Sequence, residues 1–151
     1  MDSHNKDAFY KQKQLAEFQE VFGIVFRKLK KQNEFFPETE YKLASGHMLI
    51  LLHIFKKGTC IASDISSFLG ITSGGVTGLT DTLIKNNLIK RTRLENDRRV
   101  VQLSLTEDGQ KIVEQIIEKR AEKFIQLFND LDENEIEQIL HIFQKLNSVL
   151  K

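Results

Sequence analysis

A change of hydrophobic period within residues 71–106 constrains the fold of this 151-residue chain more than any other feature. From Val76 the apolar side chains recur every three to four residues, as Leu79, Leu83 and Ile84, which is the spacing of one helical face. From Val101 the apolar residues instead alternate with polar ones, which is the spacing of a strand with one buried side. The segment therefore predicts a helix followed by a β-ribbon.

Two polar turns are expected to separate these elements. Asn86-Asn87 stands where the helix should stop, because Asn tolerates the left-handed backbone that often ends a helix. Residues 89–94 supply a weaker partner strand, and residues 95–98, Glu-Asn-Asp-Arg, form the tip between the strands. A helix followed by a charged two-stranded ribbon is the outline of a winged helix, whose helix enters the major groove of DNA while the ribbon tip approaches the minor groove.

The charge distribution agrees with this outline. Between Thr72 and Leu103 there are six basic and three acidic residues, a local charge of +3, and because the whole chain carries +1 the remainder carries −2. Phosphate binding needs concentrated cations, since neutralising phosphates releases counterions and supplies most of the affinity that does not depend on sequence. A basic segment within a nearly neutral protein meets that need.

This segment resembles the DNA-binding half of the MarR family of bacterial transcriptional regulators. The family's wing reads Asp, any residue, Arg, five residues and Leu-Thr, and Asp97, Arg99 and Leu105-Thr106 fit it without a gap. The preceding family pattern is matched by Val76-Thr77, Leu79, Leu83, Leu88-Ile89 and Arg91. The resemblance implies a mainly α fold with a small β wing, a winged helix-turn-helix flanked by long N- and C-terminal dimerisation helices.

Roles at the DNA follow from residue chemistry and from the resemblance together. Arg99 aligns with the family's minor-groove arginine, and Asp97 with the carboxylate that orients the wing. Arg91 either binds phosphate with its basic neighbours or pairs inside the protein. The residues expected at the DNA are Thr72, Ser73, Gly74, Thr77, Lys90, Arg93, Asp97, Arg98 and Arg99.

Some of these positions have plainer alternatives. Thr72 can serve only as a helix cap, and the wing can be a surface hairpin with an ordinary ion pair. The family seldom has glycine at both Gly74 and Gly75, and usually has glycine where Asn87 stands. The paired glycines either let the helix approach the sugar-phosphate backbone closely or weaken the start of the helix.

The rest of the chain is read as helices around this unit. We expect a long amphipathic helix over residues 7–33, ended by Phe35-Phe36-Pro37, and a central helix capped by Ser45 that runs to about Lys57. A very short strand at 59–61 and a short helix at 63–69, ended by Gly70, should follow. After the wing, Thr106 caps a helix to about Asp130, and Asp132 with Glu135 has the spacing of a capping box for the last helix.

These elements suit one domain over residues 1–151, with a winged-helix lobe at 41–106 and dimerisation helices at 7–33 and 107–151. The terminal helices carry more apolar surface than the small lobe can cover. By resemblance they interlock into a homodimer, which places the two DNA-reading helices about 34 Å apart on a pseudo-palindromic operator in double-stranded DNA.

No segment predicts a membrane span or a secretory signal, so we expect a cytoplasmic protein. The single cysteine, Cys60, is expected to be a small buried side chain, with a redox sensor as the alternative. His47 and His53 lie six residues apart on one helix and therefore point to different faces, so no metal site or other cofactor is expected. In many MarR relatives a small aromatic or phenolic effector binds between the dimer helices and the DNA-binding lobe, where Phe22, Phe26, His47 and His53 can line a pocket.

The sequence favours a DNA-binding regulator over two other classes of function. The glycines of residues 74–78 match neither the phosphate-binding loop nor the dinucleotide fingerprint, and no catalytic triad or dyad stands out, so we expect no enzyme. A winged helix that binds another protein rather than DNA is the alternative. Arg98 and Arg99 in the wing favour DNA.

Overall fold

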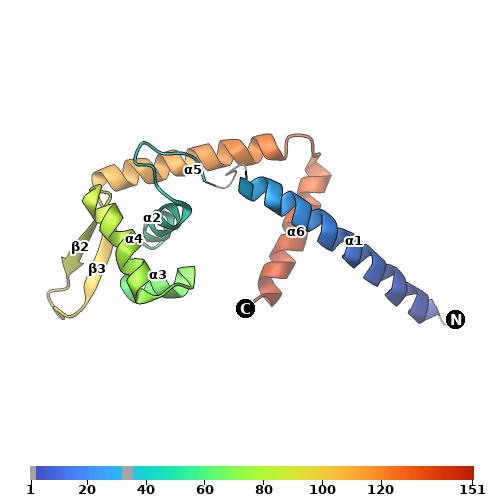
Figure 1. The fold of residues 1–151 in the computed structure, drawn as a ribbon, viewed down its shortest axis with the longest axis horizontal. Helices are drawn as coiled ribbons and strands as arrows, with labels where there is room; N and C mark the ends of the chain where they lie inside the picture. Colours follow the sequence, from blue (N-terminus) through green and yellow to red (C-terminus); the bar gives the residue numbers. More distant parts are fainter. Residues whose placement is uncertain (1–2, 32–35) are drawn as a thin grey trace. The chain divides into compact units, whose positions relative to one another are not determined.

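The computed structural model describes residues 3–31 and 36–151, which form two compact units. One unit holds α1, and the other spans Phe36–Lys151 (Figure 1). The elements in chain order are α1 (Ser3–Lys31), α2 (Ser45–Lys57), β1 (Thr59–Ile61), α3 (Ala62–Leu69), α4 (Ser73–Lys85), β2 (Ile89–Arg93), β3 (Val101–Leu105), α5 (Glu107–Leu127) and α6 (Glu133–Val149).

The core of the second unit is built around α2, which confirms the central position expected for this helix. Ile50, Leu51 and Ile54 have no exposed surface. They pack in one cluster with Leu83 of α4 and Leu88 of the turn that follows it. Burying such side chains contributes about 1.5–3 kcal/mol each before the entropy cost of folding, so this cluster holds the winged helix together.

The sheet has three antiparallel strands in the order β1-β3-β2. The predicted ribbon is confirmed as β2 and β3, in which Arg91 lies opposite Leu103. The short strand β1 pairs with the other edge of β3 and sets Cys60 opposite Leu103. Both side chains are buried, so the third strand joins the sheet where it closes the core.

Several helix ends are confirmed. Thr106 caps α5, because its Oγ1 accepts a hydrogen bond from the Gly109 amide at 3.0 Å. Asp132 and Glu135 form the expected capping box at α6, each side chain accepting the other's backbone N–H at 2.9 Å. Gly70 ends α3 in the left-handed conformation, with φ +65°.

The prediction that Ser45 caps α2 was wrong. Ala44 is the cap residue, and its N–H donates to Nδ1 of His47 at 3.1 Å, so Ser45 is already the first helical residue. The imidazole three positions into the helix supplies the acceptor that usually comes from an acidic or amide side chain there. α5 also ends at Leu127, three residues earlier than expected.

The first helix begins earlier and is described to Lys31, and its predicted end at residues 33–36 lies mostly outside the described residues. The single-domain boundaries stay a prediction. No helix in the described part of the chain combines the length and apolarity that crossing a bilayer requires.

Within the second unit, α5 begins beside the β2–β3 ribbon and α4, and α6 follows at its other end (Figure 1). A helix of 21 residues is about 31 Å long. The winged helix and α6 are therefore attached to opposite ends of one long helix.

Candidate nucleic-acid interface

The turn between α3 and α4 sets the start of the second helix. The Gly70 amide donates to the Ser66 carbonyl at 2.9 Å, and the Ser66 hydroxyl donates to the Ile71 carbonyl at 2.6 Å. Thr72 then caps α4, since its Oγ1 accepts from the Gly75 amide at 3.2 Å. The capping role that was the alternative for Thr72 is thus present, and its exposed hydroxyl keeps a proton to donate.

The outward face of α4 consists of small residues. Val76, Thr80 and Leu83 point into the core, which leaves the first two turns of the opposite face to Ser73, Gly74, Gly75, Thr77 and Gly78. The Thr77 hydroxyl donates to the Ser73 carbonyl at 3.0 Å. The glycines lie within a capped, regular helix, so the alternative of a frayed start does not describe this structure.

The end of α4 confirms the predicted stop at Asn86-Asn87. Asn87 has φ +57°, the left-handed conformation, and Asn86 has φ −84° as the cap. The Leu88 amide donates to the Leu83 carbonyl at 2.9 Å, which closes the last turn. The chain can then reverse directly into β2.

The wing tip is shaped by Asp97. Its Oδ1 accepts from the Arg99 amide at 3.0 Å, and its carbonyl accepts from the Val100 amide at 3.0 Å. The Leu94 amide donates to the Val100 carbonyl at 3.2 Å and closes the loop. The Asp97 carboxylate is therefore held by a backbone amide of the turn. The side chains of Arg98 and Arg99 remain exposed.

Basic side chains lie along β2 and at the wing tip. Lys90 and Arg93 are exposed along β2. Arg93 and Arg98, with Leu94 and Glu95, line a cleft of about 570 Å³ at the wing. The planar donor fork of each Arg suits a phosphate oxygen, whereas the Glu95 carboxylate at the same cleft opposes an anion.

Arg91 pairs rather than standing free. Its Nη2 donates to Oδ1 of Asp81 on α4 at 2.6 Å, and both side chains are about half exposed. The sequence alternative of pairing is confirmed, although the pair lies at the surface and not inside the protein. No sequence signal singled out Asp81, because the contact spans ten residues and forms only when β2 folds back along α4.

The four residues expected to line an effector pocket have other partners in the structure. Phe22 and Phe26 stack on each other on α1, with ring centroids 6.1 Å apart. His47 accepts the Ala44 N–H, whereas His53 stacks on Phe68 of α3 at 4.2 Å. The two histidines thus engage different surroundings, as their spacing predicted, and burial lowers the pKa of each.

Cys60 is a core residue in this structure. It lies opposite Leu103 of β3 with its side chain in the core, and burial raises the pKa of its thiol to about 11, with the charge of Asp64 acting in the same direction. This agrees with the structural expectation for Cys60. Within residues 3–31 and 36–151, no three His, Cys, Asp or Glu side chains converge as metal ligands would.

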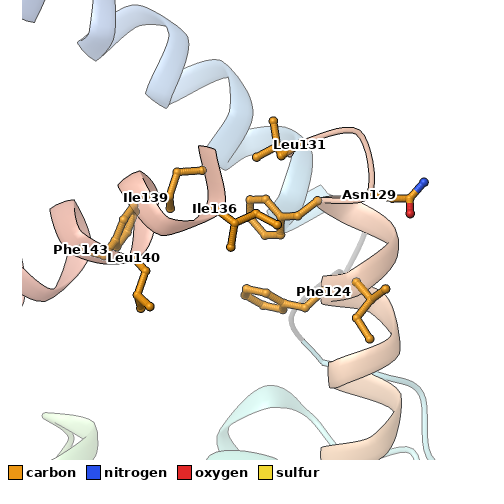
Figure 2. A pocket seen from close by; sticks show the side chains of 9 residues that line it. Phe124, Asn129, Leu131, Ile136, Ile139, Leu140 and Phe143 are labelled. Carbon is orange, nitrogen blue, oxygen red and sulfur yellow. The ribbon is translucent and has the colours of Figure 1, made fainter. Parts of the chain in front are cut away.

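Sequence reasoning did not foresee the apolar groove where α5 meets α6. Figure 2 shows Phe124 of α5 facing a space that is also lined by Ile136, Leu140 and Phe143 of α6. The groove has a volume of about 600 Å³. Its signal in the sequence was the apolar stripe on each helix, but the groove itself depends on the angle of the turn between them.

Comparison with known proteins shows which family this winged-helix chain resembles. The family model described as "MarR family" matches residues 43–101, which hold α2, the helix-turn-helix and the wing tip. The HTH-type transcriptional regulator YwhA of Bacillus subtilis is 33% identical over 64% of this chain and 70% of its own length. The chain belongs to the MarR family. It is accordingly a transcriptional regulator with a winged helix-turn-helix for binding DNA.

Other MarR-type proteins extend the similarity to most of the chain. The HTH-type transcriptional repressor MdtR of Bacillus subtilis is 29% identical over 87% of this chain and 84% of its own length. The solved structure of a MarR family protein from Bacillus stearothermophilus has a TM-score of 0.78, at 24% identity over 91% of this chain and 95% of that one. That structure shows the MarR fold, and the named relatives are transcriptional regulators rather than enzymes.

Proposed function

We propose that this MarR-family protein binds a pseudo-palindromic operator in double-stranded DNA as a homodimer, and represses transcription until a small effector releases it. The contact between Asp81 and Arg91 carries this proposal. It joins the outward face of α4 to β2, so the hydroxyl-bearing helix face and the basic ribbon form one continuous surface. A surface of that kind suits a duplex, whose grooves and phosphates are contacted together.

The chemistry of each side chain suggests its place on the duplex. Ser73 and Thr77 offer hydroxyls at the start of α4, where Gly74 allows the backbone to come close and Thr72 adds its free proton. Arg99, oriented by the turn at Asp97, suits a narrow minor groove with its strong negative potential. Lys90, Arg93 and Arg98 suit the phosphates on either side.

Exposed apolar side chains support the homodimer. Helices α1, α5 and α6 each carry a row of large apolar residues that are 40% or more exposed, which is rare on the surface of a monomer. They include Phe18, Phe22 and Phe26 of α1, Ile117 and Phe124 of α5, and Leu140, Phe143 and Leu146 of α6. A second copy of the chain is the proposed cover for these rows, with residues 7–33 and 107–151 as the dimerisation helices of a single domain.

Repression and its release by an effector extend the proposal to regulation. MdtR, which matches most of this chain, is named a repressor. A small aromatic or phenolic molecule is the proposed effector, with Phe22, Phe26, His47 and His53 as its candidate contacts. A protein that acts on chromosomal DNA in this way works in the cytoplasm.

A mobility-shift titration on the DNA upstream of the protein's own gene, with excess competitor DNA, tests the proposal. We expect specific binding that weakens by roughly 10³ or more between 50 and 200 mM salt, as six or more neutralised phosphates require. Arg99→Ala should abolish most of the specific binding and leave the dimer intact by analytical ultracentrifugation. Lys56→Ala removes the same charge from an exposed position on α2 and is the matched control.

The alternative is a winged helix that binds another protein without specific DNA binding. It predicts no specific shift at either salt concentration from a folded dimer, and equal behaviour of Arg99→Ala and Lys56→Ala. Salt-sensitive binding by wild type with a selective loss in Arg99→Ala would exclude it.

A further inference from the structure

The end of α4 is joined to the start of α5 by a compact set of hydrogen bonds. The Thr106 hydroxyl donates to the Asn87 carbonyl at 2.6 Å, and the Thr106 amide donates to the Leu88 carbonyl at 3.1 Å. The same hydroxyl caps α5 by accepting from Gly109. The Asn87 amide group adds a bond to Oδ2 of Asp108 at 3.3 Å. We call Asn87, Leu88, Thr106, Asp108 and Gly109 the α4–α5 junction.

The backbones of the two segments also touch. A Cβ atom built on Gly109 would lie 1.9 Å from the Leu88 carbonyl oxygen, so the first turn of α5 rests directly on the turn that ends α4. Leu88, Ile112 and Val113 are buried together below this contact. The α4–α5 junction is therefore held by hydrogen bonds at its surface and by apolar packing in the core.

A small rotation at this junction would displace the DNA-facing start of α4 by a large distance. α4 has 13 residues and is about 20 Å long, and the junction lies at its C-terminal end, whereas Ser73, Gly74 and Thr77 lie at the other. A rotation of about 10° at the junction would shift the Ser73 end by roughly 3–4 Å. That displacement is about the 3.4 Å rise of one base pair.

We infer that Asn87, Thr106 and Asp108 are positioning residues that set the angle of α4 on α5, and through it the half-site spacing that the dimer accepts. The inference rests on the proposed dimeric DNA binding. It follows because α5 belongs to the proposed dimer interface while α4 carries the residues proposed to read the half-site, and the junction hydrogen-bonds the end of one helix directly to the start of the other. These side chains need not touch the DNA themselves.

The test uses an operator selected from random-sequence duplexes by the wild-type protein, and versions with one base pair inserted or removed between the half-sites. Thr106→Val removes the hydroxyl at nearly constant size. Asn87→Gly keeps the left-handed turn and removes only the bond to Asp108. Thr106→Ser restores the hydroxyl, and Ile54→Val, in the core at α2, serves as a destabilised control with an intact junction.

We expect wild type, Thr106→Ser and Ile54→Val to prefer the selected spacing by about tenfold or more, the effect of losing one well-placed base contact. Thr106→Val and Asn87→Gly should lower that preference to about threefold or less. Their affinity for a duplex without the operator and their dimer mass should stay at the wild-type values. Two variants are used so that a folding failure in one leaves the other to decide.

Wild-type spacing preference in the folded junction variants would overturn the inference, and so would an equal loss in Ile54→Val. A wild-type protein that selects no operator would instead overturn the proposed function, and the inference with it. The behaviour of the wild-type protein alone therefore tells the two failures apart.

Discussion

The guanidinium of Arg91 lies 2.6 Å from the carboxylate of Asp81, and this ion pair bridges the ribbon and the outward face of α4. Both side chains remain about half exposed, so water screens the attraction. The pair neutralises the one acidic side chain that the described part of α4 carries, on a face that we propose to meet phosphates.

For this pair we expect a small contribution to stability. Exposed ion pairs are typically worth about 0.2–1 kcal/mol. A double-mutant cycle with Asp81→Ala, Arg91→Ala and the double variant, followed by urea denaturation, measures the coupling directly. A coupling above about 2 kcal/mol would show that the pair is a structural lock rather than a screened surface contact.

Gly109→Ala should be among the most destabilising single-methyl changes in the protein. The added Cβ meets the Leu88 carbonyl, which is backbone and cannot rotate away, so α5 must shift off the turn. We expect a loss of about 3 kcal/mol or more in the free energy of unfolding, at the upper end of overpacking effects. Thermal denaturation measures it, and a variant within about 0.5 kcal/mol of wild type would contradict the close approach.

Gly78→Ala should stabilise the protein in the absence of DNA. Apart from its own helix, no atom of the described chain lies within 4 Å of a Cβ built there, and Ala is favoured over Gly within a helix by about 1 kcal/mol. The unfolding free energy should therefore rise. If α4 approaches DNA closely, operator affinity should fall in the same variant, and an unchanged affinity in a mobility shift would count against that approach.

His53 should make stability depend on pH. Burial lowers its pKa below the ordinary 6.5, with Lys57 and Lys56 adding to the shift and Asp64 opposing it. In the described chain its Nε2 is buried without a hydrogen-bond partner. The unfolded chain therefore binds the proton more readily, so stability is complete above pH 6.5 and falls as the pH drops through that value.

The variant His53→Phe tests this assignment, because a phenyl ring can stack on Phe68 and cannot titrate. We expect urea denaturation at pH 7.5 and 5.5 to show a smaller loss for His53→Phe than for wild type. Part of the loss should persist, since the pKa of His47 is also lowered by burial. Identical losses in the two proteins would assign the pH dependence elsewhere.

Cys60 should be unreactive in the folded protein. Its side chain is 3% exposed, and a pKa of about 11 leaves very little thiolate at neutral pH. A disulfide reagent such as dithionitrobenzoate should therefore modify native protein at least about 100-fold more slowly than urea-denatured protein. Rapid stoichiometric modification of the native state would contradict this prediction and favour a redox-sensing role for Cys60.

Signals contained in a few neighbouring residues determined much of this fold. The caps at Thr106 and Asp132, the left-handed turn at Asn87 and the alternation from Val101 to Leu105 were all predicted, because each depends on backbone chemistry within one helical turn or one strand. The MarR motif of the wing could likewise be recognised from the sequence, because its residues lie within ten positions of one another. Even so, local rules misplaced the cap of α2, where an imidazole took the role of a carboxylate.

The tertiary structure decided the relationships between residues that are far apart along the chain. Whether Arg91 meets a phosphate or Asp81, whether Thr59–Ile61 joins the sheet, and why position 109 excludes a side chain all depend on how separate elements pack. Apolar spacing states which face of a helix is buried, but not which backbone or carboxylate will lie against it. Those contacts are set only when burial of the common core fixes the distances between elements.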